Sequence, residues 1–568
     1  MATPLRYGTE FVINTTLADV QFTPDITGLA DGRFVATWAD LSRSADDPSA
    51  LAVRAQVFNA DGSKARAEFL VNTDITESQL APAVTALAGG GFVVTWQDEN
   101  PALGGGDGSG GSVKAQVFGA SGRAVGSEIL ANTSVLNSQE DPTITTLTNG
   151  RFVVAWRDAS QFGVAGAFND IRAQVFDVNG SKFGAEVLLT TAPGSNQLAP
   201  SITALSNGRF VASWLDQTLS FGTEVSNQIK ARVFNADGTP FSSDFQVNTI
   251  TTDIQFDARV TALTNGRFVV SWTDNSQSVT DPSSLAVRAQ VFDASGAAVG
   301  AEFLAATNLA NKQEHSDIMG LSDGRFVIAW VDGSFVGGDG QGSAIKAQLF
   351  NGNGSKSGDE FLVNTTISGN QSDPTVSELA DGRFVVAWGS ENVGDIFAQI
   401  FDPREAAVSL TGGALADQFV GTRFGDTLSG GKARDDLKGA DGADQLFGGM
   451  GGDILTGGGG NDTLVGGAGQ DVLRGGAGAD VFVFGAAGDT PVANPDRIAD
   501  FAHGVDLIDL GGFMAGGVFI AGAGFDGVAG EVRYDAGSLS GDVDGNMVAD
   551  WSIILTGNPA IDSGDLRF

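Results

Sequence analysis

The sequence is poor in the residues that carry much enzyme chemistry, with no cysteine, two histidines and two tyrosines in 568 residues. The absence of cysteine excludes disulfides, thiolate catalysis and cysteine-ligated zinc sites. The two histidines, His315 and His503, are too far apart in the chain to form an HExxH zinc motif. We therefore expect that the protein is not an enzyme.

Basic residues are also scarce, with 32 Lys and Arg against 68 Asp and Glu and a net charge of −36. Such a charge argues against nucleic acid and against anionic membrane surfaces as partners. No apolar run is long enough to span a membrane, and the N-terminus lacks the basic and then apolar pattern of a signal peptide. We expect no nucleic-acid partner and no transmembrane segment.

The most specific pattern present is a run of eight nine-residue units at residues 412–483, for example GGMGGDILT. Glycine lets six residues form a tight turn, and the next three form a short strand whose middle side chain points inward. Carboxylates and turn carbonyls are the ligands that calcium prefers. The tract therefore predicts a parallel β-roll that binds several calcium ions. The sixth-position carboxylates are Asp417, Asp426, Asp435, Asp444, Asp453, Asp462, Asp471 and Asp480.

This tract resembles the repeats-in-toxin (RTX) family of calcium-binding proteins. The resemblance implies that each ion lies between turns two units apart, so that Asp417 would share an ion with Asp435. The first three units have Leu415, Phe424 and Ala433 at the fourth position, which makes their ion sites the doubtful ones. The later five units have glycine there, and these predicted site residues are Gly442, Gly451, Gly460, Gly469 and Gly478.

The segment after the roll resembles the C-terminal domain of serralysin-type metalloproteases. Residues 496–501 read DRIADF, and residues 504–510 read GVDLIDL. In that family the C-terminus is an uncleaved signal for type I secretion through an ABC exporter, and the chain folds outside as calcium binds. The resemblance therefore implies a secreted, extracellular protein. We assign 404–411 to a linker, 412–483 to the roll and 484–568 to this C-terminal domain with its secretion signal.

A further calcium loop is predicted in this domain. Asp542, Asp544, Asn546 and Asp550 place oxygen ligands at i, i+2, i+4 and i+8, which resembles an EF-hand-like loop without its twelfth-position Glu. The alternative is an ordinary turn rich in Asp and Asn.

The first 403 residues are a sevenfold internal repeat in which Trp recurs mostly every 58 residues. Each repeat reads as four short strands, with Asn-Gly or Asp-Gly at the usual hairpin turn, which predicts a β-propeller blade. The last repeat lacks its fourth strand, and an unpartnered copy at residues 10–15 would close the last blade. A row of separate β-sandwiches and an open solenoid are the alternatives, but neither explains the displaced strand.

Two features of the repeats look structural. The tryptophans should pack in the core, because stacked blades need large side chains against small ones. Six repeats also have an Asp two residues after Trp and a basic residue in the next strand, whereas the seventh lacks both, which predicts an ion pair in six blades. The expected pairs are Asp40–Arg54, Asp98–Lys114, Asp158–Arg172, Asp216–Lys230, Asp274–Arg288 and Asp332–Lys346.

The expected fold is all-β: a seven-bladed β-propeller at residues 1–403, a parallel β-roll and a small C-terminal β domain. We expect function in the variable loops between the second and third strands, such as 99–107 and 337–340. The expected function is calcium-dependent folding after export, with the propeller as an adhesion or ligand-binding module for an extracellular glycan or protein. The alternatives are a polysaccharide hydrolase or lyase that uses rim carboxylates, and a structural component of a matrix or surface layer.

Overall fold

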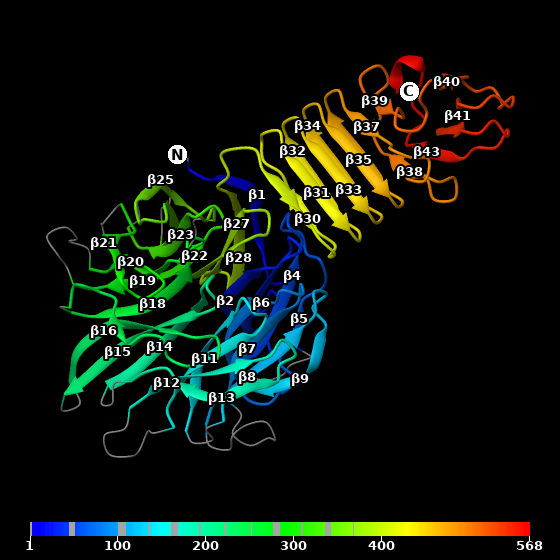
Figure 1. Ribbon diagram of the computed structural model, residues 1–568. Helices are drawn as coiled ribbons and strands as arrows, with labels where there is room; N and C mark the ends of the chain where they lie inside the picture. The colour runs from blue at the N-terminus through cyan, green and yellow to red at the C-terminus, as the bar shows by residue number, and fades with distance from the viewer. Residues whose placement is uncertain are drawn as a thin grey trace. The chain divides into compact units, whose positions relative to one another are not determined.

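The computed structural model describes residues 3–44, 51–99, 110–133, 137–160, 168–191, 195–220, 223–251, 253–276, 284–307, 311–334, 342–366 and 369–568. Within these ranges the chain forms β-strands and one 3₁₀ turn (Ser563–Asp565), and no helix in them is long and apolar enough to cross a membrane. The chain divides into two compact units, Met1–Pro403 and Arg404–Phe568. The predicted fold class is confirmed, because a seven-bladed propeller precedes a parallel β-roll (Figure 1).

The first unit consists of seven antiparallel four-stranded sheets, the blades of the propeller. Each inner strand contacts the inner strand of the next blade, and β26 contacts β2, so the blades close into a ring. The inner strands are β2 (Gln21–Gly28), β6 (Gln79–Ala86), β10 (Gln139–Thr146), β14 (Ser195–Ala204), β18 (Gln255–Ala262), β22 (Gln313–Gly320) and β26 (Gln371–Glu378). The second strands are β3 (Phe34–Asp40), β7 (Phe92–Asp98), β11 (Phe152–Asp158), β15 (Phe210–Ser220), β19 (Phe268–Asp274), β23 (Phe326–Asp332) and β27 (Phe384–Ser390). The third strands are β4 (Ala52–Phe58), β8 (Ser112–Phe118), β12 (Asp170–Phe176), β16 (Thr223–Phe234), β20 (Ala286–Phe292), β24 (Ala344–Phe350) and β28 (Asp395–Asp402). The outer strands are β5 (Phe69–Leu70), β9 (Ala124–Leu130), β13 (Lys182–Leu188), β17 (Phe245–Gln246), β21 (Ala298–Leu304), β25 (Lys356–Leu362) and β1 (Leu5–Val12).

The outer strand of the last blade comes from the start of the chain. Strand β1 pairs antiparallel with β28, although it spans Leu5–Val12 rather than residues 10–15. The carboxylate of Glu10 also accepts hydrogen bonds from the backbone N–H and the hydroxyl of Thr365, at 2.5 and 2.8 Å. The two ends of the repeat region are therefore joined in one sheet, which removes two unpaired strand edges.

The blade core follows from the repeat. The seven tryptophans are buried, with exposed fractions of 0 or 1%, as core packing requires. Beside them, phenylalanines from the second and third strands stack, for example Phe34 on Phe58 with centroids 4.8 Å apart. These rings pack against the neighbouring blade, as Phe34 and Phe58 do with Val385 and Ile400 of the seventh blade.

All six predicted ion pairs are present. In the first blade Arg54 Nε lies 2.5 Å from Asp40 Oδ2, and Arg54 Nη1 lies 3.3 Å from Oε1 of Glu68, the residue before the outer strand. Partners on both sides offset the cost of burying the charge. In the seventh blade, where the pair is absent from the sequence, Phe397 stacks on Trp388 instead.

The second unit is built from two sheets whose strands alternate along the chain, because each nine-residue unit supplies one turn and one strand. Its first strand, Ser409–Thr411, lies in the segment expected to be a linker. One sheet has the order β29 (Ser409–Thr411), β31 (Thr427–Lys432), β33 (Gln445–Met450), β35 (Thr463–Ala468), β37 (Val481–Val483), β39 (Leu507–Asp509) and β44 (Leu566–Arg567). The other has the order β30 (Gln418–Val420), β32 (Asp436–Asp441), β34 (Ile454–Gly459), β36 (Val472–Ala477), β38 (Asp496–Ile498), β43 (Trp551–Leu555), β42 (Ser538–Asp542), β41 (Glu531–Asp535) and β40 (Val518–Phe519).

The roll and the C-terminal segment share one core. The eighth-position side chains, from Phe419 to Phe482, are 0–5% exposed and cluster with Ile498, Ile508 and Trp551 of the later strands. Both sheets run on from the nonapeptide units into residues 484–568, so these two regions form one continuous body rather than two separate cores.

Candidate functional site

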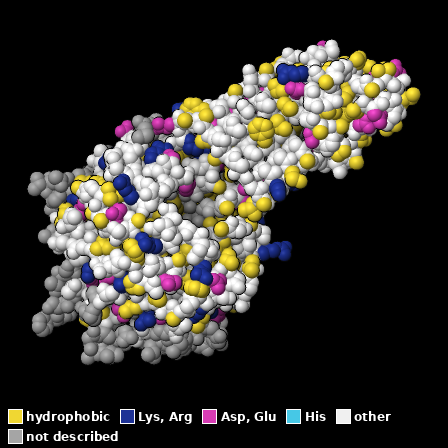
Figure 2. All heavy atoms as spheres, viewed as in Figure 1, with side chains coloured by type: hydrophobic (Ala, Val, Ile, Leu, Met, Phe, Trp, Pro, Cys, Tyr) yellow, Lys and Arg dark blue, Asp and Glu magenta, His cyan; other side chains and the backbone are white. Residues whose placement is uncertain are grey.

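The sixth-position aspartates form a ladder along the roll. In the six from Asp435 to Asp480, Oδ1 accepts a hydrogen bond from the backbone N–H of the aspartate two units earlier, for example Asp435 from Asp417 at 2.8 Å and Asp480 from Asp462 at 3.0 Å. All eight side chains are buried, with exposed fractions of 3% or less. The structure thus brings together the residues that the sequence pairs at a spacing of two units. On the face shown in Figure 2, few acidic side chains lie over the strands of the roll, in keeping with this burial.

The second oxygen of these carboxylates is well placed for a cation. Oδ2 is buried without a hydrogen-bond partner in six of the eight, from Asp435 to Asp480. A Cβ added to Gly448 would lie 2.5 Å from both Asp453 Oδ2 and the carbonyl oxygen of Gly466. A buried carboxylate oxygen and a backbone carbonyl therefore converge on a space that only glycine leaves open. This donor set fits calcium, which takes carboxylate and carbonyl oxygens together.

The pKa shifts of these aspartates are consistent with a calcium site. Burial raises the pKa of Asp435 to about 6, and the like charges of Asp453 and Asp417 raise it further. Burial likewise raises the pKa of Asp444, Asp471 and Asp480 to about 6. A buried carboxylate without a counter-charge is costly, and a divalent cation supplies the missing charge.

The fourth-position glycines explain how the turns stack. Gly460 has φ of +131°, and a Cβ there would lie 1.6 Å from the carbonyl oxygen of Gly442 in the turn two units earlier. Gly451, Gly469 and Gly478 have the same close approach. In the third unit Ala433 takes this position with φ of +74°, so its turn differs from the later ones.

The ladder continues beyond the nonapeptide units through two residues that the sequence pattern does not reveal. Asp496 Oδ1 accepts from Asp471 N at 2.8 Å, and Asp506 Oδ1 accepts from Asp480 N at 3.1 Å. Oδ2 of Asp496 is also buried without a partner, and burial raises the pKa of Asp496 to about 7. The spacing of 18 residues becomes 25 and 26 here, so a periodic search misses both residues. The DRIADF and GVDLIDL segments that contain them are the available signal.

The predicted loop at 542–550 brings three carboxylates together. Ligand oxygens of Asp542, Asp544 and Asp550 lie within 4.8 Å of one another. Asn546 is placed differently, with Oδ1 accepting from the backbone N–H of Val548. Burial opposes the charged form of Asp542, but hydrogen bonds from three backbone N–H groups prevail and lower its pKa.

The propeller loops expected to carry function lie largely outside the described residues, at 100–107 and 337–340. A polar cavity of about 530 Å³ is instead formed by the inner strands of all seven blades. Each inner strand has a register irregularity and a non-glycine residue with φ between 47° and 53°. These positive-φ residues are Thr23, Ala81, Asp141, Ala199, Asp257, His315 and Asp373.

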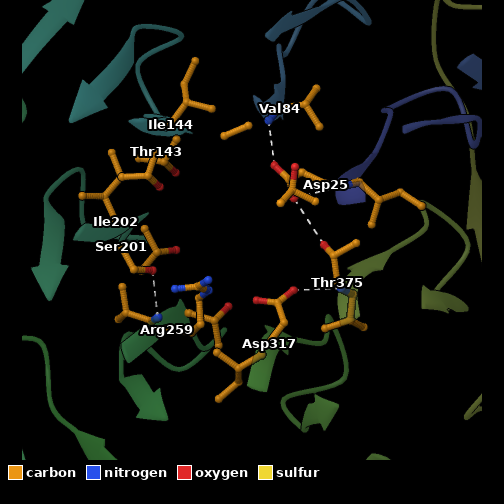
Figure 3. Close-up of a pocket in the computed structure, with 18 of the residues that line it drawn as sticks. Asp25, Val84, Thr143, Ile144, Ser201, Ile202, Arg259, Asp317 and Thr375 are labelled. Carbon is orange, nitrogen blue, oxygen red and sulfur yellow. Dashed lines mark hydrogen bonds between the residues drawn. The ribbon is translucent and has the colours of Figure 1, made fainter. Parts of the chain in front are cut away.

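The residue two positions after each positive-φ residue lines the cavity. Figure 3 shows Asp25, Arg259 and Asp317 there, on the first, fifth and sixth blades. The hydroxyl of Thr375 donates to Asp25 Oδ1 at 3.2 Å. Burial raises the pKa of Asp25 to about 6, and the like charge of Asp317 raises it further. Burial also raises the pKa of Asp317, although the guanidinium of Arg259 acts against it.

Each histidine faces a carboxylate, and one serine motif lies in a hairpin turn. His315 Nδ1 lies 2.9 Å from Asp257 Oδ2 at the cavity wall, and His503 Nδ1 lies 2.7 Å from Asp565 Oδ2. The sequence GLSDG at 320–324 occupies the turn between β22 and β23, where Ser322 donates to Glu378. This is not the strand-to-helix turn on which a nucleophilic serine sits.

Solved structures similar to the propeller have low sequence identity. They include a protein of unknown function from Dyadobacter fermentans (12% identity, TM-score 0.42), which covers 71% of this chain and 99% of that one. An α-L-arabinanase from Penicillium chrysogenum has 13% identity and a TM-score of 0.40, over 70% of this chain and 99% of that one. Polysaccharide lyase Uly1 has 10% identity and a TM-score of 0.43, over 70% and 100%. Similarity at this level says nothing about the ligand or activity of the chain.

Family comparisons cover the second unit. Residues 411–446 match the RTX calcium-binding nonapeptide repeat, and residues 436–566 match the peptidase M10 serralysin C-terminal family. No curated protein matches the chain significantly. The resemblances predicted from the sequence are confirmed. After the residues of its seven-bladed β-propeller, this chain carries RTX calcium-binding repeats that continue into a serralysin-type C-terminal region.

Proposed function

We propose that the protein is secreted by a type I exporter and that its second unit folds outside the cell as calcium fills the aspartate ladder. The observation that carries this proposal is the series of buried carboxylate oxygens without partners, with a backbone carbonyl oxygen beside those of Asp444, Asp453 and Asp462. A net charge of −16 after Arg404, from 24 acidic and 8 basic residues, opposes folding before the ions bind. The serralysin-type match and the absence of cysteine are consistent with this export route.

The test is a calcium titration of the purified full chain from a chelated state, followed by far-UV circular dichroism and by counting bound ions. We expect strand signal to appear with calcium uptake. A double variant, Asp453→Asn with Asp471→Asn, should bind fewer ions and fold only at higher calcium. Asp535→Asn, which removes an exposed carboxylate in the same unit, is the matched control. A second unit that is equally folded in chelator, with no uptake of calcium, would refute the proposal.

The propeller is proposed to be a module that binds an extracellular ligand rather than a catalytic domain. The support is a polar cavity on the ring axis, lined by the inner strands of all seven blades. A glycan array probed with the full chain in calcium and in chelator tests this role. Binding in calcium supports it, whereas no binding under either condition contradicts it.

A further inference from the structure

The seven blades share one repeated sequence pattern, so a residue that departs from the pattern can indicate a role other than blade structure. The cavity position two residues after the positive-φ residue is occupied by a small residue in four blades: Ala83, Thr143, Ser201 and Thr375. The first, fifth and sixth blades have Asp25, Arg259 and Asp317 there instead. The fifth and sixth blades also replace the proline of the other five with Ala258 and Ser316. The departures therefore gather on one part of the ring.

These charges are not needed to hold the blades together. Asp25 Oδ2 accepts from Val84 N at 2.7 Å, and Asp317 Oδ2 accepts from Val376 N at 2.8 Å, each on the next blade. In the fourth blade the hydroxyl of Ser201 accepts the equivalent bond from Val260 N at 3.1 Å. A neutral hydroxyl is therefore enough to accept this hydrogen bond between blades. In the second blade the methyl side chain of Ala83 cannot accept it. Burying a carboxylate there costs more than burying a hydroxyl, so the carboxylates have another use.

The contacts of Arg259 also indicate a role other than holding the blades together. Its Nη1 donates to the carbonyl oxygen of Ala258 at 3.2 Å, and within the described ranges it forms no ion pair. Its side chain enters the cavity beside Asp317 (Figure 3). A guanidinium has five N–H donors, so most of them remain available to a ligand.

We propose that this cavity is the ligand site of the propeller and that it binds the end of a neutral, polyhydroxylated ligand, a saccharide, between Asp25, Asp317 and Arg259. The inference rests on the proposed binding role of the propeller and adds the place and the ligand class. Two carboxylates accept hydrogen bonds from sugar hydroxyls, and the guanidinium donates to hydroxyl or ring oxygens. The volume of about 530 Å³ lies within the range of roughly 300–1,000 Å³ typical of small-ligand sites.

The signs of the charges select a neutral ligand. A charged sugar that contacted all three groups would bring a carboxylate near Asp25 and Asp317 or an ammonium near Arg259. Each such contact between like charges is unfavourable. A neutral saccharide uses both kinds of group without that cost.

The test is isothermal titration calorimetry of the calcium-loaded full chain with neutral pentasaccharides of arabinose, xylose, mannose and glucose. Galacturonate and glucosamine pentamers serve as charged probes. Arg259→Gln and Asp317→Asn should each weaken the best neutral ligand about 10- to 100-fold, the value of a hydrogen bond to a charged group. The matched control is Arg151→Gln with Asp177→Asn, an arginine–carboxylate pair of the propeller that does not line the cavity.

The outcomes separate the two proposals. If a neutral saccharide binds and neither cavity variant weakens it, the cavity is not the site, although the propeller still binds a ligand. Tighter binding of a charged pentamer overturns the ligand class. No binding of any pentamer overturns this inference, and an empty glycan array is needed as well to contradict the binding role of the propeller. Thermal unfolding of each variant in calcium identifies any that fails to fold, and for such a position Asp25→Asn provides the replacement test.

Discussion

At the scale of single residues, the stacked turns of the later units of the roll depend on glycines whose replacement is costly. Gly460→Ala should lower the unfolding free energy of the calcium-loaded second unit by about 2 kcal/mol or more. The reason is that its φ of +131° is disfavoured for alanine and the new Cβ would lie 1.6 Å from a carbonyl oxygen. Gly413→Ala is the control, because no atom lies within 4 Å of a Cβ there. Equal denaturant midpoints for the two variants in excess calcium would contradict the stacking argument.

A second residue-scale prediction concerns pH. Burial raises the pKa of Glu378 from 4.5 to about 7, and the nearby Asp323 and Asp381 add to this effect. Because the folded pKa is the higher one, ionisation favours the unfolded chain, and this group costs stability as pH rises from about 4.5 to 7. Glu378→Gln should remove that loss, leaving the propeller more stable than wild type by up to about 3 kcal/mol at pH 8 but similar near pH 4.5. Thermal unfolding across this range measures it. The exposed Glu77→Gln is the control, and parallel pH profiles for wild type and Glu378→Gln would count against the prediction.

At the scale of elements, strand β38 extends the calcium ladder where the sequence period stops. Continuing the period of 18 residues from Asp471 would select Asp489, yet Asp489 accepts from the backbone at Gly485 and Ala486, and Asp496 takes the ladder position. Asp496→Asn should therefore reduce the number of bound calcium ions, whereas Asp489→Asn should leave it unchanged. Ion counting by equilibrium dialysis distinguishes the two. A loss on changing Asp489 alone would favour the sequence period over the geometry.

The contrast between Asp489 and Asp496 shows what could be predicted from the sequence. The ladder from Asp417 to Asp480 and the blade ion pairs were predictable, because a repeated fold places equivalent residues at a fixed spacing. Asp496 and Asp506 were not, because a longer connection precedes each strand and breaks the period. The cavity residues were missed for a different reason. A site on the axis of a ring is made by one residue per blade, and its signal is a departure from the repeat rather than a motif.

At the scale of the whole molecule, calcium should act on one unit and not on the other. The ladder carboxylates all belong to Arg404–Phe568, where the residues after Arg404 carry a net charge of −16 in the absence of ions. The propeller has its own core of seven buried tryptophans, and its buried ion pairs contain their own counter-charges. Removing calcium should therefore unfold the second unit while the propeller stays folded.

Trp551 makes this separation measurable, because it is the one tryptophan outside the propeller and is fully buried in the second unit. Adding chelator should expose its indole and shift the fluorescence emission to longer wavelength, while the other seven contribute no change. In a Trp551→Phe variant the shift should disappear, although far-UV circular dichroism should still report the loss of strand in the second unit. Re-adding calcium should restore both signals in the wild type. If the variant retained the chelator-induced shift, the propeller tryptophans would be responding too, and calcium would control the folding of the whole chain rather than that of the roll and its C-terminal continuation.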